Sequence, residues 1–264
     1  MKNAEERSPV VARLRGDVLT HIVTLKMLRL YGDSMQVYLV EDETGWASLS
    51  LLPVQVSDFD RQTYPDADFV VLVDGTSGMA KSLLLEKLPP GCLVIKTSDA
   101  TVKAFAADRL GAKKVRSFKS FTQPAGVGPT AVVAGVKESD VLSPEIERMI
   151  SGQGSLSSEL ADHFAEGARW FALDDSGRPV SACFVFRNFD NVWEVAGVYT
   201  EGQHRRQGLA RKVVTAALAY LAGRKLIPRY QVRSDNVESA QLALSVGLRE
   251  FIQIDHWVAD SRRR

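Results

Sequence analysis

The stretch HRRQGLARK, residues 204–212, surrounds a single glycine with four cationic side chains. It follows a strand-like run and opens an apolar helical one. Backbone N–H groups at the start of a helix lack intrahelical partners, and the helix dipole adds partial positive charge there. Gly208 lets a large anion approach that backbone, and Arg205, Arg206 and Arg211 can add charge-assisted hydrogen bonds. The chemistry that this pattern favours is binding of a pyrophosphate.

The pattern RxxGxA is weak by itself, because an arginine-rich helix start is also typical of a solvated surface. The dinucleotide pattern GxGxxG and the phosphate-loop pattern GxxxxGK[ST] are both absent, which disfavours dinucleotides and nucleoside triphosphates. The surrounding sequence is more specific. The strand-like run VWEVAGVYT precedes the turn, and a second strand leads into NVESAQLALSVGL.

This combination resembles the GNAT superfamily of N-acetyltransferases. In that family the pattern Gln/Arg-x-x-Gly-x-Gly/Ala binds the pyrophosphate of coenzyme A, and it matches Arg205, Arg206, Gln207, Gly208, Leu209 and Ala210. The family's later segment, Asn-x-x-Ser/Ala-x-x-Leu ending in Gly-Phe, matches Asn236, Ser239, Leu242, Gly247 and Leu248. The resemblance covers Thr130 to about Val258. It is looser to branches with an extra amino-terminal domain, such as the glycine N-acyltransferase-like ones.

The resemblance implies how the strand before the turn is used. In the family this strand separates from its neighbour and exposes backbone groups to the pantetheine arm, which makes Val198 and Thr200 the expected backbone partners. Asn236 is expected to contact the coenzyme, and Ser239 to line the same site. A helix N-cap is the other role open to Asn236, which asparagine favours, and both roles are compatible.

Acetyl transfer to an amine requires a neutral nitrogen, so a base or a water relay must accept a proton. Glu194 is the first candidate, because it lies on the strand four residues before Val198; the alternative is a solvated or salt-bridged glutamate. Asp190 and His204 are weaker candidates. Many family members place a tyrosine, the acid for the departing thiolate, where this chain has Ala243. A water, Ser239 or another tyrosine then donates the proton, or the thiolate leaves unassisted.

The order of expected elements is that of an α+β protein with a mixed sheet flanked by helices. The proline- and glycine-rich segment TQPAGVGPT, residues 122–130, divides the chain into an amino-terminal α/β domain (1–125) and a GNAT domain (130–264). Residues 97–115 align without a gap on residues 233–251, so the first domain is either a degenerate GNAT-like half or an unrelated α/β domain. The segment TAVVAG, residues 130–135, is expected to be a strand.

Composition excludes several classes of function. The 264 residues carry a net charge of +1, with 33 basic and 32 acidic residues, so no overall field favours nucleic acid or a membrane surface. The two cysteines lie far apart, the four histidines have no metal-ligand spacing, and the amino-terminal segment lacks the apolar core of a signal peptide. The longest apolar stretch is too short to span a bilayer. We therefore expect a cytoplasmic protein without a metal; a homodimer is left open.

The leading hypothesis is an N-acetyltransferase that uses acetyl-CoA as co-substrate and acts on the primary amine of a small molecule, amino acid or peptide. The alternative is a non-catalytic acyl-CoA-binding sensor or regulatory module, which the substitution at Ala243 supports.

Overall fold

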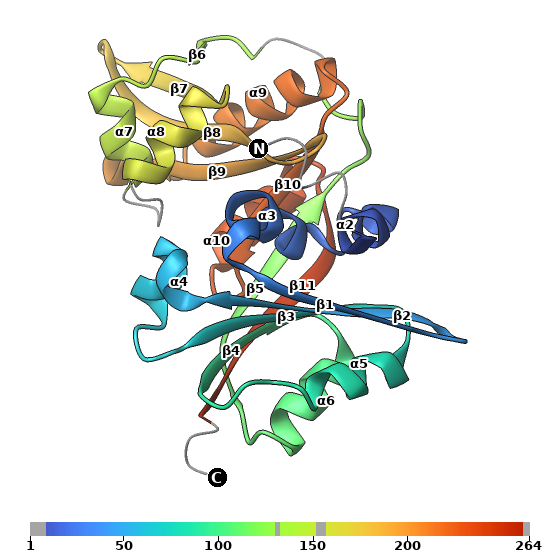
Figure 1. Cartoon of the computed structure of the whole chain (residues 1–264). Helices are drawn as coiled ribbons and strands as arrows, with labels where there is room; N and C mark the ends of the chain where they lie inside the picture. Colours follow the sequence, from blue (N-terminus) through green and yellow to red (C-terminus); the bar gives the residue numbers. More distant parts are fainter. Residues whose placement is uncertain (1–8, 130–132, 152–156, 261–264) are drawn as a thin grey trace. The chain divides into compact units, whose positions relative to one another are not determined.

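The computed structural model describes residues 9–129, 133–151 and 157–260 (Figure 1). It is an α+β structure in which helices flank a mixed sheet, as the sequence predicts. The chain divides into unit 1, Met1–Phe118 with Ile252–Arg264, and unit 2, Lys119–Phe251. The chain passes from one unit to the other within strands β5 (Lys113–Thr122) and β11 (Arg249–Asp260).

Unit 1 begins with short helices and continues with strands that alternate with helices. Its helices are α2 (Pro9–Leu14), α3 (Ile22–Tyr31), α4 (Asp58–Thr63), α5 (Gly78–Leu85) and α6 (Ala100–Asp108). Its strands, besides its parts of β5 and β11, are β1 (Gln36–Asp42), β2 (Gly45–Pro53), β3 (Phe69–Gly75) and β4 (Cys92–Thr97). Single 3-10 turns lie at Arg15–Asp17, Gly32–Ser34 and Val54–Val56.

The strand order in unit 1 is β1-β2-β3-β4-β11-β5. Strands β3 and β4 are parallel, and β1–β2, β2–β3 and β4–β11 are antiparallel. Alternate residues of β3 enter different cores: Val71 and Val73 pack with side chains of α5 and α6, and Val70 and Leu72 pack with Met27 of α3. The sheet of unit 1 is therefore covered on both faces.

Sequence reasoning missed strand β2 and helices α2, α3 and α4. Ser48 and Ser50 of β2 are fully buried and lie between apolar residues of the strand. Because small polar residues at buried positions interrupt the apolar run, they weaken the signal on which strand prediction depends.

The described residues of unit 2 form four helices, a run of antiparallel strands and a parallel strand pair. Its helices are α7 (Pro144–Ser151), α8 (Ser157–Ala165), α9 (Leu209–Gly223) and α10 (Val237–Ser245), with a 3-10 turn at Gly202–His204. Its strands are β6 (Val136–Ser139), β7 (Arg169–Asp175), β8 (Arg178–Phe189), β9 (Val192–Thr200) and β10 (Ile227–Arg233). Starting at β5, the strand order is β5-β10-β9-β8-β7-β6.

Helices of unit 2 cover opposite faces of its sheet (Figure 1). One core joins α9 and α10 to Val195 of β9, and the other joins α7 to Phe184 and Phe186 of β8. The two cores leave β9 in the middle, with side chains directed to both. A change in the pairing of β9 with a neighbouring strand therefore affects the packing on both faces of the sheet.

The strand expected at residues 130–135 begins later. Residues 130–132 lie outside the described part of the chain, residues 133–135 form a turn, and strand β6 starts at Val136. Gly135 has a φ of 81°, a left-handed conformation that ends regular extended structure, so the strand starts after it.

The two units share one internal arrangement, which supports the similarity between residues 97–115 and residues 233–251 in the sequence. Each has a short parallel strand pair joined by a helix: β3 and β4 through α5, and β9 and β10 through α9. The gapless alignment needs a correction at the following helix. It places Ala100 opposite Asn236, whereas the N-cap residues are Asp99 in α6 and Asn236 in α10, a shift of one residue.

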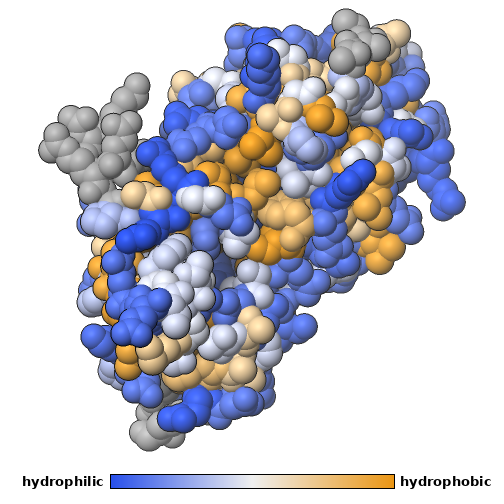
Figure 2. All heavy atoms as spheres, turned by 90° about the vertical axis from the view of Figure 1, so that its right-hand side faces the viewer, coloured by the Kyte–Doolittle hydropathy of each residue, from blue (hydrophilic) through white to orange (hydrophobic). Residues whose placement is uncertain are grey.

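Figure 2 shows hydrophobic side chains bordered by hydrophilic ones on the face that it displays. Folded proteins usually expose apolar atoms over much of their surface, so this mixture does not by itself mark a binding site. Within the described residues, the helices lack the length and apolar character that a membrane span requires.

Candidate coenzyme A site

The start of helix α9 provides backbone N–H groups that no side chain caps. Its N-cap is Gly208, whose φ of 76° and ψ of 8° lie in the left-handed region, and no side-chain hydrogen bond caps the helix. A Cβ at Gly208 would meet no heavy atom within 4 Å, so the space beside it is open. The first turn of α9 is therefore open to an anion, and pyrophosphate binding there stays a prediction.

The turn before α9 is exposed, cationic and strained. Arg206 has a φ of 64°, a conformation that non-glycine residues seldom adopt and that is concentrated at ligand sites. The Arg205 side chain donates from Nε to the Thr200 carbonyl at 3.1 Å, and this contact holds the guanidinium over the end of β9. Of the predicted residues, Leu209 and Ala210 are half-buried, and the exposed ones are Arg205, Arg206, Gln207, Gly208 and Arg211.

Strands β9 and β10 pair over a short distance and then separate. Their parallel register runs from Val192 opposite Ile227 to Val195 opposite Tyr230. Among the described residues, this pairing ends at Val195, and the rest of β9, which includes Val198 and Thr200, leads away from β10 toward the start of α9. Backbone groups there are available to an extended ligand, which is the arrangement expected for the predicted partners.

A bulge in β9 lies where the strands separate. The register with β8 shifts between Ala182 and Phe184, and Gly197 has a φ of 60°. A Cβ at Gly197 would lie 2.8 Å from Phe184 and 3.0 Å from Ile150, so packing as well as backbone conformation requires glycine. Bulges of this kind often re-aim side chains beside functional sites.

Helix α10 contributes its N-cap and a hydroxyl pair. The Asn236 side chain accepts a hydrogen bond from the Ser239 backbone N–H at 3.0 Å, which confirms the N-cap role; its contact with a coenzyme stays a prediction. The Ser239 hydroxyl lies 2.9 Å from the Tyr230 hydroxyl. Burial raises the pKa of Tyr230 to about 12, so its phenol keeps its proton at neutral pH.

Glu194 is buried and held by two partners. Its Oε2 accepts from Arg229 at 2.7 Å and from the Asn188 amide at 2.8 Å, while Arg229 also donates to Ser120 at 3.1 Å. In the described part of the chain, no hydrogen bond reaches the other carboxylate oxygen, Oε1. Glu194 is thus salt-bridged, which is the alternative interpretation given above from the sequence. The other oxygen of its carboxylate is left for another partner.

The weaker base candidates lie elsewhere along β9. His204 lies in the turn after the strand, 3.2 Å from Asp175, and Asp190 lies in the turn before it with a φ of 47°. The hydrogen bond from His204 helps to lower the pKa of Asp175. Neither residue shares the buried surroundings of Glu194.

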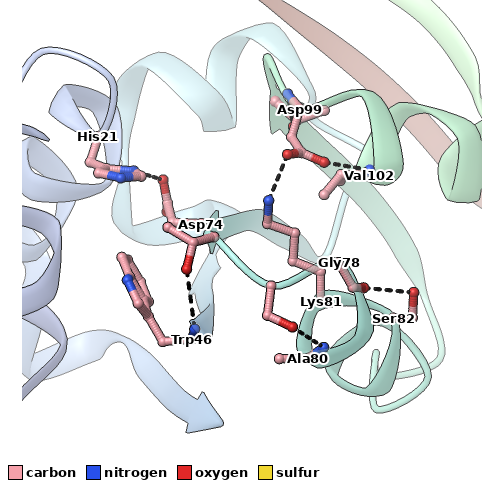
Figure 3. A network of polar contacts seen from close by, with 12 residues as sticks. His21, Trp46, Asp74, Gly78, Ala80, Lys81, Ser82, Asp99 and Val102 are labelled. Carbon is pink, nitrogen blue, oxygen red and sulfur yellow. Dashed lines mark hydrogen bonds and ion pairs between the residues drawn. The ribbon is translucent and has the colours of Figure 1, made fainter. Parts of the chain in front are cut away.

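Unit 1 has a different arrangement at the corresponding helix (Figure 3). Helix α5 is capped by Ser77, whose side chain accepts from the Ala80 N–H at 3.1 Å. Lys81 of the same helix pairs with Asp99, the N-cap of α6, at 2.7 Å. Ser77 caps α5, whereas the corresponding helix of unit 2, α9, has no side-chain cap. The first turn of α5 is therefore less open to an anion than that of α9.

Comparison with known proteins identifies the part of the chain that carries this site. The model of the acetyltransferase (GNAT) family matches residues 142–248. Residues 142–248 are a GNAT acetyltransferase domain. This GNAT domain includes the cationic turn, the separated strands and the start of α10. A comparison with curated proteins gives no significant match.

Solved structures resemble the chain at low sequence identity. A GCN5-related N-acetyltransferase from Kribbella flavida has a TM-score of 0.59 and 14% identity, covering 91% of this chain and 95% of that one. A tandem GNAT protein from the clavulanic acid biosynthesis pathway has a TM-score of 0.53 and 15% identity, with coverage of 91% and 87%. A GCN5-related N-acetyltransferase-like protein from Streptococcus suis has a TM-score of 0.51 and 16% identity, with coverage of 94% and 97%. These likenesses show the GNAT fold.

Sequence reasoning missed Arg229 and Tyr230 in the GNAT domain. Both lie on β10, and their partners Glu194 and Ser239 are distant in sequence or on another element. A single arginine or tyrosine in a strand gives no signal of such a contact. Within the described residues, no group of three or more His, Cys, Asp or Glu side chains is placed to hold a metal ion.

Proposed function

We propose that the protein transfers an acetyl group from acetyl-CoA to a primary amine. The observation that carries this proposal is the opening of β9 away from β10 beside the uncapped start of α9. The acetyl-CoA thioester, when bound, supplies the activated acyl group. The first-turn N–H groups of α9, with Arg205, Arg206 and Arg211, are suited to the pyrophosphate.

The remaining predicted contacts belong to this proposal. In this proposal, backbone groups of Val198 and Thr200 pair with the extended arm of the coenzyme, and Asn236 and Ser239 contact it from α10. The amino-terminal domain of the glycine N-acyltransferase-like kind stays a prediction, as do the domain boundaries at 125 and 130. Two repeated units and the likeness to a tandem GNAT protein support a degenerate GNAT-like origin of the first half.

Glu194 is the proposed acceptor of the amine proton. Arg229 and Asn188 hold one of its oxygens, so the carboxylate has a defined orientation and does not rotate freely. Its other oxygen, Oε1, accepts the proton either directly or through a water. A water relay between the amine and Oε1 reduces the demand on the carboxylate.

The Tyr230 hydroxyl holds a proton at the point where the strands separate, and we expect it to serve the leaving group in place of the tyrosine that Ala243 replaces. Ala243 is fully buried in the core with α9, so a tyrosine does not fit there. Tyr230→Phe should lower kcat about 10²-fold, the low end of acid–base assistance, because a thiol with a pKa near ~8.5 departs tolerably unassisted.

The control for this variant is Ser239→Ala, which removes the partner hydroxyl but keeps the phenol. It should lower kcat less than Tyr230→Phe, and Tyr230→Phe should leave the coenzyme A affinity measured by calorimetry unaltered. Unchanged kcat in Tyr230→Phe, with a lower melting temperature, would assign the tyrosine a purely structural role.

The function itself is tested by two measurements on the whole chain. Calorimetry should show binding of coenzyme A, and thiol release from acetyl-CoA should depend on an amine in a chemically varied panel. Binding without thiol release for any amine would favour the acyl-CoA sensor. Absence of coenzyme binding would contradict both functions.

A further inference from the structure

A cavity of about 690 Å³ lies in unit 2, on the side of β9 away from α9. Tyr199 and Glu201 line it, whereas the neighbouring Val198 packs against the core that contains α9. Its other walls come from α7, from β6 and from the hairpin of β7 and β8. Its volume lies within the range usual for small-molecule sites.

The cavity wall includes the opened part of β9. Tyr199 belongs to the segment beyond Val195, the last residue of β9 that pairs with β10. A small molecule in the cavity therefore contacts the strand whose other face is turned toward α9 and the proposed coenzyme site. This is the position from which an acceptor amine can approach the transferred group.

Charged groups of both signs line the cavity, and they are unequally compensated. Lys137 and Asp174 form an ion pair at 2.6 Å. Arg148, in the last turn of α7, and Arg178, the first residue of β8, also line it and are exposed, and the exposed carboxylate of Glu145 lines it from the first turn of α7. Within the described residues, neither guanidinium forms an ion pair with a carboxylate.

Two guanidinium groups without carboxylate partners favour an anionic ligand group. Arginine binds carboxylates through two parallel N–H donors, which adds geometric specificity to charge. Trp170 and Tyr199 give the same cavity aromatic surface, and Glu201 provides a carboxylate on the side of β9. An ammonium group near Glu201 and an anion near the arginines would both be compensated.

We propose that the acceptor is an amine that also carries a carboxylate, as an amino acid does, and that Arg148 and Arg178 bind this carboxylate. The proposal rests on the proposed acetyl transfer, since it names the substrate class of that reaction. It separates this chain from transferases for simple alkylamines or for polyamines, whose ligands lack a carboxylate for the two arginines to bind.

The test compares amino acids with their carboxamides, which keep the α-amine and side chain but lack the negative charge. Product formation from acetyl-CoA, measured by mass spectrometry, should give a kcat/KM at least 10-fold higher for the acid than for the amide. In Arg178→Gln and Arg148→Gln this preference should fall by 10-fold or more, while kcat/KM for the amide stays nearly constant. Arg249→Gln, an exposed arginine outside the cavity, is the matched control and should keep the preference.

Saturation-transfer NMR of the same ligands on the whole chain gives a readout independent of turnover. The acid should show stronger saturation than the amide, and the difference should disappear in Arg178→Gln. Equal treatment of acid and amide by an active enzyme would overturn this inference and leave acetyl transfer intact. Selective binding of the acid without transfer to any amine would overturn both the acceptor role of the cavity and the proposed function.

Discussion

Gly208→Asp will weaken coenzyme A binding by about 10²- to 10³-fold. A carboxylate at the start of α9 lies beside the expected pyrophosphate, and like charges a few ångströms apart repel by ~4 kcal/mol at the effective dielectric near a protein surface. The new carboxylate can also accept hydrogen bonds from the N–H groups that the phosphate needs. Isothermal titration calorimetry on the folded variant measures the loss.

The matched control is Gly208→Asn, which has the same shape without the charge. Both side chains must adopt the left-handed backbone of Gly208, which aspartate and asparagine tolerate better than other residues, and both enter open space. The variants should therefore fold alike, and the asparagine variant should lose much less affinity. If the folded aspartate variant binds as tightly as the unaltered protein, the coenzyme lies elsewhere and this site is misassigned.

Salt concentration gives this comparison an internal check. The affinity gap between the aspartate and asparagine variants is electrostatic and should narrow as ionic strength rises, because the Debye length falls to ~3 Å at 1 M salt. A gap that salt leaves unchanged would indicate a difference in shape or folding.

The cationic turn was predictable because its chemistry is contained in consecutive residues. Arg205 to Arg211 include the charges, the glycine and the start of the helix, so the sequence defines both the ligand class and the element that presents it. The backbone strain at Arg206 was not predictable, because the sequence carries no rule that places an arginine in the left-handed region.

Long-range partners were beyond sequence reasoning for a different reason. Glu194 and Arg229 come together because β9 and β10 pair in parallel with Glu194 opposite Arg229. A one-residue slip would send either side chain to the other face of the sheet, and only the three-dimensional register decides this. The cavity of unit 2 was equally hidden, since its lining residues come from α7, from the four strands β6 to β9 and from the segments that connect them.

The first half of the chain shows what a local sequence pattern can predict about structure and what it cannot. The similarity between residues 97–115 and 233–251 predicts a repeated structural unit. Each unit does contain a short pair of parallel strands joined by a helix. The pattern could not show that Ser77 caps α5 while Gly208 leaves α9 uncapped, because a capping serine depends on its backbone conformation as much as on its identity.

Glu194→Gln will lower the rate of acetyl transfer by about 10²- to 10⁴-fold at neutral pH, the range that general-base assistance supplies. Glutamine keeps the shape of the side chain, and its amide oxygen can still accept from Arg229 and Asn188. The change therefore removes the basicity at Oε1 with little loss of local packing. Steady-state kinetics across pH on an amine substrate, with coenzyme A affinity measured in parallel, test this expectation.

The pH profile distinguishes a base from a structural partner. If Glu194 accepts the amine proton, raising the pH should partly restore the variant, because more of the amine is already neutral. If Glu194 only compensates the buried Arg229 charge, the variant should unfold at a lower temperature and show no pH-dependent rescue, since removal of one partner leaves a buried charge uncompensated.

Arg229→Gln provides the reciprocal control, since it frees Glu194 from its guanidinium partner. Because this variant keeps the Glu194 carboxylate, it should retain transfer activity after correction for its folded fraction. Near-unaltered turnover of Glu194→Gln at every pH would exclude Glu194 as the base. The proton would then have to leave through water to Asp190 or to backbone carbonyls of the opened strand.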